Sequence, residues 1–329
     1  MTEYVIRRFF LALVTIWIVL TFVFFVLRVL PGDYAEQQLA NQILASAART
    51  EEEREDQLAN IRARLGTDKP LYEQYWRFWE KIFTGESEKS FRKGLPAYSV
   101  AADALPYTLQ LGIMSLIIAI LLAVPVGVLS SIRPDGFLDA GLRVFAIFFL
   151  AAPPFLTAVI ASVYAVKYDI LTIGVTSQQL LWEDPWASFQ LFIVPALAGG
   201  LAVGAILMRF LRSGMLEVLR QDYVRTARAK GLAGGVVVSR HVLRNALIPV
   251  VTILGFLIAA LVAGNVVLEN IFAIPGMGNE ILGAIGTRDI PVTQTFTLLL
   301  VGAVVFVNLA VDLSYFLIDP RVTVSGAES

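Results

Sequence analysis

The chain has 329 residues, of which 57% are hydrophobic and 16% are charged, whereas a soluble globular domain carries roughly 25% charged residues. The net charge is −1 and the mean hydropathy is +0.71, so the composition favours a membrane protein and gives no sign of a nucleic-acid partner. Cysteine is absent, which excludes disulfides and thiolate chemistry.

The charged residues leave six long gaps in the sequence. A helix needs about 20 mostly apolar residues to cross a hydrocarbon core of about 30 Å, and six buried helices of a soluble protein would rarely all be so long and so free of charge. We therefore predict an all-α, polytopic membrane protein with six transmembrane helices in contact with lipid. The uncharged stretches are 9–27, 104–132, 144–166, 185–208, 245–268 and 290–311.

Residues 1–30 are predicted to form a cytoplasmic N-terminus and the first membrane helix. Arg7 and Arg8 precede an apolar run that is too long for the hydrophobic region of a signal peptide, so we expect residues 9–30 to be retained. Short loops on the cytoplasmic side are rich in Arg and Lys. The loops between successive helices alternate in this respect, so both termini are expected in the cytoplasm.

Residues 31–106 are predicted to be an extracytoplasmic helical segment. The acidic run 51–56 is typical of a solvated helix, and apolar residues follow it at helical spacing. Trp76, Phe78, Trp79 and Phe83 then form an aromatic cluster close to the point where the chain returns to the membrane. This cluster fits an aromatic belt at the membrane interface, and it also fits a docking surface for an external partner.

Residues 107–318 are predicted to be the permeation core with helices two to six, and residues 319–329 a cytoplasmic tail. Pro153 and Pro154 lie in the third uncharged stretch, and because proline removes backbone hydrogen bonds we expect a kink there. The kink is a candidate gate, and it could equally serve packing alone. Gly200 and Gly204 permit close approach of the fourth helix to a neighbour.

The reactive groups of an enzyme do not gather in this sequence. His241 is the single histidine, and no Gly-x-Ser-x-Gly turn occurs. The dipeptide Gly-Lys is absent, so the chain has no Walker-type phosphate loop. The centres of the predicted helices carry no ionisable residue, which argues against an ion-coupled carrier. We therefore expect a transport subunit that is not an enzyme, holds no cofactor and receives its energy from elsewhere.

The candidate site is the basic segment 212–248 between the fourth and fifth helices. The sequence predicts a short basic helix from Asp222 to Lys230, which Gly231 ends because glycine releases the helical backbone. A second short helix would lead to Pro249 in the first turn of the fifth membrane helix. Composition alone is equally consistent with a basic anchor on anionic headgroups.

The run 222–232 closely resembles the coupling motif of ABC importer permeases of the dipeptide/oligopeptide/nickel type, and the run 240–249 resembles the sequence that follows it. In the wider superfamily the motif reads Glu-Ala-Ala, then three other residues, then Gly. Ala227 and Gly231 keep that spacing. Arg225 and Thr226 replace the Glu and the first Ala, as is common in the peptide branch. Further similar runs follow in the family's order over nearly the whole chain, at 4–8, 28–33, 65–71, 105–109, 269–278, 288–291 and 319–321.

Two features depart from the family pattern. Residues 233–236 are small and apolar where polar or charged residues usually stand, and the external segment around 37–60 is longer than in many relatives. The first departure would loosen one side of the coupling contact.

The resemblance implies a type I ABC importer permease fold in the cytoplasmic membrane of a bacterium or archaeon. It implies a second homologous permease subunit, two cytoplasmic ATPase subunits that would hold ATP and magnesium, and an external solute-binding protein. The solute would be a peptide or a related small molecule, and an ATPase-independent channel or scaffold is the alternative function. The residues implied in ATPase coupling are Asp222, Tyr223, Arg225, Thr226, Ala227, Arg228, Lys230, Gly231 and Leu232, and the candidate kink or gate residues are Pro153, Pro154 and Pro249.

Overall fold

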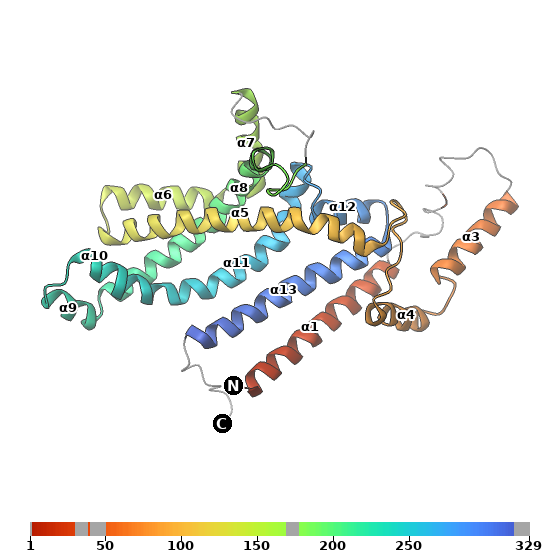
Figure 1. Cartoon of the computed structure of the whole chain (residues 1–329), viewed down its shortest axis with the longest axis horizontal. Coiled ribbons are helices and arrows are strands. Elements are labelled where there is room, and N and C mark those ends of the chain that lie inside the picture. The colour runs from red at the N-terminus through yellow and green to blue at the C-terminus, as the bar shows by residue number, and fades with distance from the viewer. Residues whose placement is uncertain (1, 30–38, 40–50, 169–177, 319–329) are drawn as a thin grey trace. The chain divides into compact units, whose positions relative to one another are not determined.

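A computed structural model describes residues 2–29, 39, 51–168 and 178–318, and these residues form helices without a β-sheet (Figure 1). The all-α fold class is thereby confirmed. The predicted cytoplasmic tail 319–329 lies outside the described residues, as do 31–38 and 40–50 of the predicted extracytoplasmic segment.

The described helices keep the order that the sequence predicts. They are α1 (Thr2–Val29), α3 (Glu51–Leu65), α4 (Leu71–Thr84), α5 (Ala97–Ile132), α6 (Phe137–Ala151), α7 (Pro154–Lys167), α8 (Pro185–Leu219), α9 (Asp222–Ala229), α10 (Gly234–Val236), the π-helix η1 (Val237–Leu243), α11 (Arg244–Ile271), α12 (Met277–Gly286) and α13 (Ile290–Ile318).

Five of the six uncharged stretches are continuously helical, and the third is helical on both sides of a break at residues 152–153. Within the described part of the chain, α1, α5, α8 and α13 are each long and apolar enough to cross a membrane. Helices α6 and α7 qualify as a pair with a bend of 102° between them. Helix α11 covers the fifth stretch with 28 residues but is not among these candidates. The count of six spans therefore stays a prediction, and so does the side of the membrane on which the termini lie.

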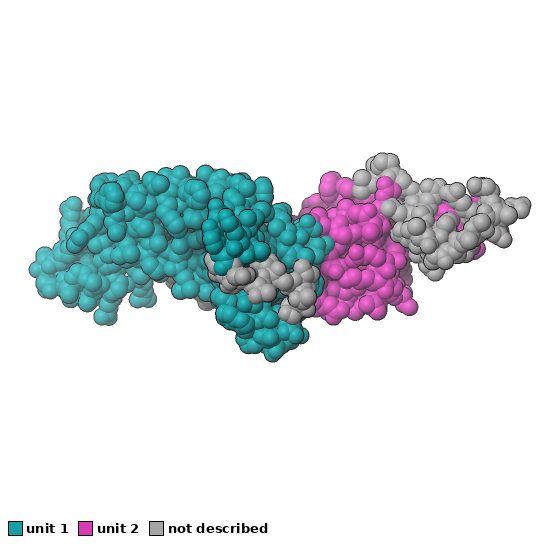
Figure 2. Space-filling model, turned by 90° about the horizontal axis from the view of Figure 1, so that it is seen from above, with its two compact units in different colours: residues 1–12, 105–279, 303–329 teal, residues 13–104, 280–302 magenta. Residues whose placement is uncertain are grey.

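The chain folds as two compact units, which Figure 2 distinguishes by colour. Unit 1 comprises residues 1–12, 105–279 and 303–329, and unit 2 comprises residues 13–104 and 280–302. The basic segment 212–248 lies entirely in unit 1. The described part of the predicted extracytoplasmic segment lies almost entirely in unit 2, since only its last two residues fall outside it.

Helix α8 forms the centre of unit 1. Of its most apolar stretch, 61% is buried inside the chain, compared with 28% for α5. A Cβ atom on Gly200 would lie 2.7 Å from the backbone oxygen of Ser115, and one on Gly204 would lie 2.9 Å from the side chain of Leu122. Helix α5 therefore packs directly against the backbone of α8, as the two glycines predict.

Pro153 and Pro154 break the third uncharged stretch instead of merely kinking it. Helix α6 ends at Ala151, Pro153 is extended with φ −59° and ψ 134°, and Pro154 begins α7. Proline suits the first helical position because its missing N–H would have no helical acceptor there. The sequence thus predicted the site of the bend, whose angle of 102° turns one stretch into two separate helices. A gating role for this break stays a prediction.

Candidate functional site

Helix α9 ends in a Schellman motif built around Gly231. The backbone N–H of Gly231 donates to the carbonyl of Arg228 at 2.9 Å, and that of Leu232 donates to the carbonyl of Ala227 at 3.4 Å. Gly231 has a φ of +79°, a left-handed conformation that residues with a Cβ atom rarely adopt. A Cβ atom at this position would meet nothing within 4 Å. The backbone conformation therefore requires the glycine, whereas steric crowding within the chain does not.

Two buried residues fix α9 to the rest of unit 1. Val224 is fully buried and Ala227 is nearly so. Both belong to one apolar cluster with Met215 of α8 and with Val237 and Val242 of η1. Ala227 thus lies in the chain's own core. It positions α9 and offers almost no surface to a second protein.

The other candidate coupling residues of α9 and its C-terminal turn are exposed. Arg225 Nη1 and Asp222 Oδ1 lie 3.7 Å apart in an ion pair whose two side chains are 75% and 97% exposed. An ion pair so open to water contributes little to stability. Tyr223 and Leu232 add apolar area, since both are exposed. We call the exposed set the α9 surface; it comprises Asp222, Tyr223, Arg225, Thr226, Arg228, Lys230 and Leu232.

The connection from α9 to α11 is helical almost throughout. Helix α10, the π-helix η1 and α11 follow one another without a break. Pro249 is therefore an interior residue of α11, and the prediction that it occupies the first turn is wrong. The reason is that the preceding residues 237–243 stay helical with the wider π-type hydrogen bonding. Proline in the interior leaves the carbonyl four residues earlier, that of Asn245, without its usual donor.

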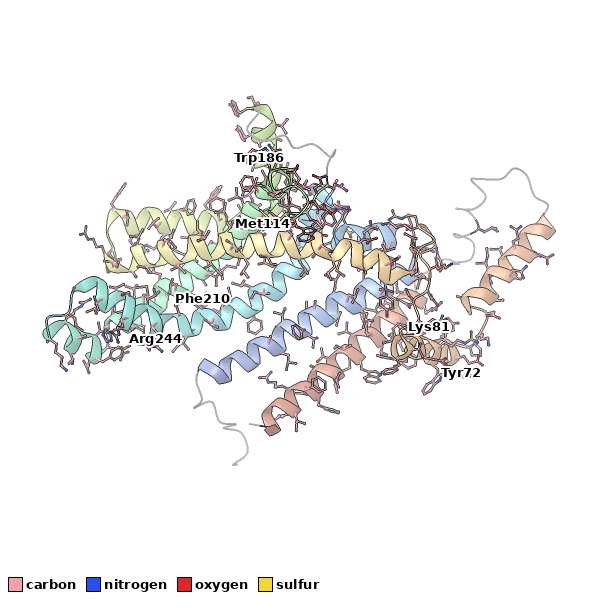
Figure 3. The ribbon with its side chains drawn as sticks, viewed as in Figure 1. Tyr72, Lys81, Met114, Trp186, Phe210 and Arg244 are labelled. Atoms are coloured by element: carbon pink, nitrogen blue, oxygen red, sulfur yellow. The ribbon has the colours of Figure 1, made fainter. Side chains whose placement is uncertain are left out.

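Asn245 links the start of α11 to α9. Its Nδ2 donates to the carbonyl of His241 at 2.7 Å and to the hydroxyl of Tyr223 at 3.3 Å. Nearby, a Cβ atom on Gly214 of α8 would lie 3.2 Å from the carbonyl oxygen of Ala246, so α8 and α11 approach closely there. Figure 3 shows Arg244 at this end of α11, close to α9. Helices α9, α8 and α11 therefore share one apolar core.

A buried ion pair on α8 lies at the start of the basic segment. Arg212 binds Asp139 of α6 with two hydrogen bonds, Nη2 to Oδ2 at 2.8 Å and Nε to Oδ1 at 2.9 Å. Asp139 is fully buried, and it also accepts the hydroxyl of Ser130 and the backbone N–H of Asp135. A buried carboxylate without such partners would be strongly destabilising. The sequence analysis missed this pair because the partners lie far apart in the chain.

A second buried carboxylate lies in the last turn of α11. Glu269 accepts the N–H groups of Gly278 at 2.7 Å and of Asn279 at 3.2 Å, and the hydroxyl of Thr108 at 2.7 Å. The two N–H groups belong to the first turn of α12, where backbone donors have no helical acceptor. A Cβ atom on Gly276 would lie 2.4 Å from the carboxyl carbon of Glu269. The glycine therefore leaves room for the carboxylate, which gives a physical reason for the residue pattern at 269–278.

The chain matches known protein families along most of its length. Residues 123–324 match the family described as binding-protein-dependent transport system inner membrane component, and residues 1–112 match the N-terminal family of the same membrane components. The chain belongs to this family of ABC importer permeases. This membership confirms the resemblance to permeases of the dipeptide/oligopeptide/nickel type and identifies a multi-pass transport subunit of the inner membrane.

Individual relatives align with the permease from end to end. It is 34% identical over 328 residues to the dipeptide transport system permease protein DppB of Bacillus subtilis, with 98% of each chain covered. It is 35% identical over 324 residues to the glutathione transport system permease protein GsiC of Pectobacterium atrosepticum, with 98% of this chain and 99% of the relative covered. Its fold is similar to that of the MetNI methionine ABC transporter in an inward-facing conformation, with a TM-score of 0.54 and 19% identity over 68% of this chain and 97% of that one. The type I importer permease fold is thereby confirmed.

Proposed function

We propose that this permease moves peptides or related small solutes across the cytoplasmic membrane, and that separate ATPase subunits drive it through the α9 surface. Two relatives over almost the full length are named as permeases for dipeptides and for glutathione, which supports a peptide-like solute. On this proposal the α9 surface and both chain termini face the cytoplasm. A second homologous permease subunit and an external solute-binding protein complete the transporter.

The observation that carries the coupling role is the division of α9 into an anchored and an open part. Val224 and Ala227 hold the helix in the core, while the remaining side chains of α9 are exposed. Lys230, Arg228 and Arg225 give this open part a positive charge, and Tyr223 and Leu232 give it apolar area. A mixture of aromatic, Arg and apolar side chains is typical of protein interfaces, whereas Lys is less common in them.

The anchored part supplies the mechanical connection. ATP binding would draw the two ATPases together and displace α9 as a rigid body. The core that α9 shares with η1, α8 and α11 would pass this displacement to the two long helices. The pathway between the two permeases would then open to one side or to the other, according to which rigid-body state ATP favours. The ion pair of Arg212 with Asp139 keeps α6 moving together with α8.

The proposal is tested by hydrolysis and uptake measured on the same preparation. The purified chain alone should hydrolyse no more ATP than an empty membrane control, because ATP and magnesium belong to the partner subunits. The assembled transporter in vesicles should hydrolyse ATP and accumulate a labelled dipeptide. Solute flux through the chain without any ATPase would instead support the channel alternative, and hydrolysis by the isolated chain would contradict the division of labour.

A further inference from the structure

Helix α4 in unit 2 has an apolar half that the chain itself covers only in part. At about 100° per residue, Tyr72, Trp76 and Phe83 fall within about 40° of one another on the helix surface. These three aromatic side chains are 72%, 73% and 81% exposed. Lys81 lies on the opposite side of the helix, and Figure 3 shows it projecting away from Tyr72. We call the three residues the aromatic stripe of α4.

The covered part of the apolar half packs on α1. The ring of Phe24 lies 5.4 Å from those of Tyr75 and Phe78, measured between centroids. The hydroxyls of Thr21 and Tyr75 form a hydrogen bond of 2.9 Å. Phe24 is fully buried by these contacts. Helix α4 is therefore fixed to one place on α1, and the position of α1 in the membrane sets the depth of α4.

Helix α4 contacts α1 near the C-terminal end of the apolar stretch of α1. The stretch runs from Ile6 to Arg28, and only 11% of its most apolar part is buried inside the chain. At about 1.5 Å per residue, Phe24 lies about 6 Å and Thr21 about 10 Å from the charged Arg28 along the helix axis. Arginine at the end of a membrane helix directs its charge toward the headgroups. Helix α4 accordingly lies at the depth where the hydrocarbon core meets the headgroup layer.

The polar side of α4 and the exposed apolar surface of α1 both agree with this depth. Arg77, Lys81 and Thr84 lie about 100–160° from the centre of the aromatic stripe around the helix, and Glu73 and Glu80 flank the stripe at about 60–80°. On α1, Phe22 and Phe25 are exposed within one turn of the contact with α4, so apolar surface continues from the membrane helix toward the stripe. Tyr and Trp favour the membrane interface, where the ring is buried and the polar atom stays wet.

We propose that α4 is an interfacial helix, which lies in the plane of the membrane with the aromatic stripe buried at the headgroup boundary of the phospholipid layer. A helix of this type binds through its buried apolar area and keeps its charged face in water. The contact fixes the tilt and depth of α1 through the rings of Tyr75 and Phe24. The stripe is thus a lipid contact, and an external protein does not cover it.

Spin labels at single cysteines test this placement, because the chain has no native cysteine. Tyr72→Cys and Phe83→Cys carry labels on two separate turns of the stripe. Arg77→Cys and Thr84→Cys are matched controls at exposed positions on the polar side of the same helix. The labelled full-length chain is assembled with its partner subunits and the external solute-binding protein in phosphatidylethanolamine and phosphatidylglycerol vesicles. Collisions of each label are then measured with oxygen, which concentrates in the hydrocarbon, and with a nickel chelate, which stays in water.

The proposal predicts opposite results on the two halves of α4. Labels at 72 and 83 should collide more with oxygen than with nickel, and labels at 77 and 84 should show the reverse. Nickel-dominated collisions at all four positions would show that the stripe faces water and would overturn the proposal. Labels at 72 and 83 that are shielded from both reagents would overturn it as well, because a protein would then cover the stripe. Two stripe positions are used so that misfolding of one variant still leaves a result.

Discussion

Replacing Gly231 with valine should uncouple the permease from its ATPases without unfolding the helical bundle. The structure shows that the added side chain meets nothing within 4 Å, so the effect comes from the backbone alone. For a residue with a Cβ atom, the left-handed conformation is about 1–2 kcal/mol higher in free energy than the right-handed one, and it is especially unfavourable for a β-branched residue. Because about 1.4 kcal/mol corresponds to a tenfold change in an equilibrium, the capped end of α9 should lose roughly a factor of ten in population.

The loss is local because only two hydrogen bonds depend on this conformation. They are the bonds from the N–H groups of Gly231 and Leu232, which close the Schellman motif. When they open, Lys230 and Leu232 leave their places on the α9 surface, whereas the buried Val224 still holds the first turn of α9. We therefore expect normal expression and membrane insertion, but weak retention of the ATPase and little uptake.

Gly234→Val is the matched control. Gly234 lies three residues further on, has equally open space around its Cβ position and does not have a positive φ. It should retain the ATPase and transport nearly as the wild type does. Gly231→Asn should keep much of the activity, because asparagine tolerates the left-handed conformation. The assay is pull-down of the ATPase from detergent beside solute uptake. Equal behaviour of the two valine variants would refute the backbone argument.

The remaining predictions concern stability and topology. Arg212→Gln should lower the melting temperature of the purified chain, but the loss of stability should be smaller than the about 3–5 kcal/mol that breaking an isolated buried ion pair costs, because Arg143 Nη2 still lies 3.4 Å from Asp139 Oδ2. The double variant with Asp139→Asn should recover part of the loss, and no recovery would mean that the pair is not what stabilises α8. Gly276→Ala should also lower the melting temperature, because the new Cβ atom would push the buried carboxylate of Glu269 out of its hydrogen bonds, which are worth about 1.5–3 kcal/mol each. An unchanged melting temperature would contradict the close approach of Gly276 to Glu269. An impermeant maleimide should label Lys89→Cys in intact cells and Ser239→Cys only after permeabilisation; labelling of both in intact cells would contradict the proposed orientation.

Local patterns in the sequence predicted the features that depend on neighbouring residues. The uncharged stretches predicted the positions of the long helices, Pro153 and Pro154 predicted the bend, and Gly231 predicted the end of α9. Each of these follows from backbone rules that act over a few residues. Pro249 was placed wrongly because a π-helix extends α11 toward the N-terminus, and no composition rule signals that wider winding.

Contacts between distant parts of the chain could not be predicted in this way. Asp139 lies 73 residues before Arg212, and neither side chain shows from its own neighbourhood that the two will meet. The burial of Ala227 has the same cause, because it depends on Met215 and Val242 of other elements. The coupling motif therefore indicated which segment matters, and the three-dimensional structure was needed to separate its anchoring residues from its open ones.

The most direct test of the coupling role is a crosslink from the α9 surface to the ATPase. A photoreactive amino acid is placed at Arg225, whose side chain is 75% exposed, and in a separate variant at Arg133, which is exposed in the turn between α5 and α6. Both variants are irradiated in membranes that contain the assembled transporter. We predict an ATPase adduct from position 225 and none, or far less, from position 133. Absence of an adduct at 225, or equal adducts from both positions, would contradict the assignment of α9 as the docking element.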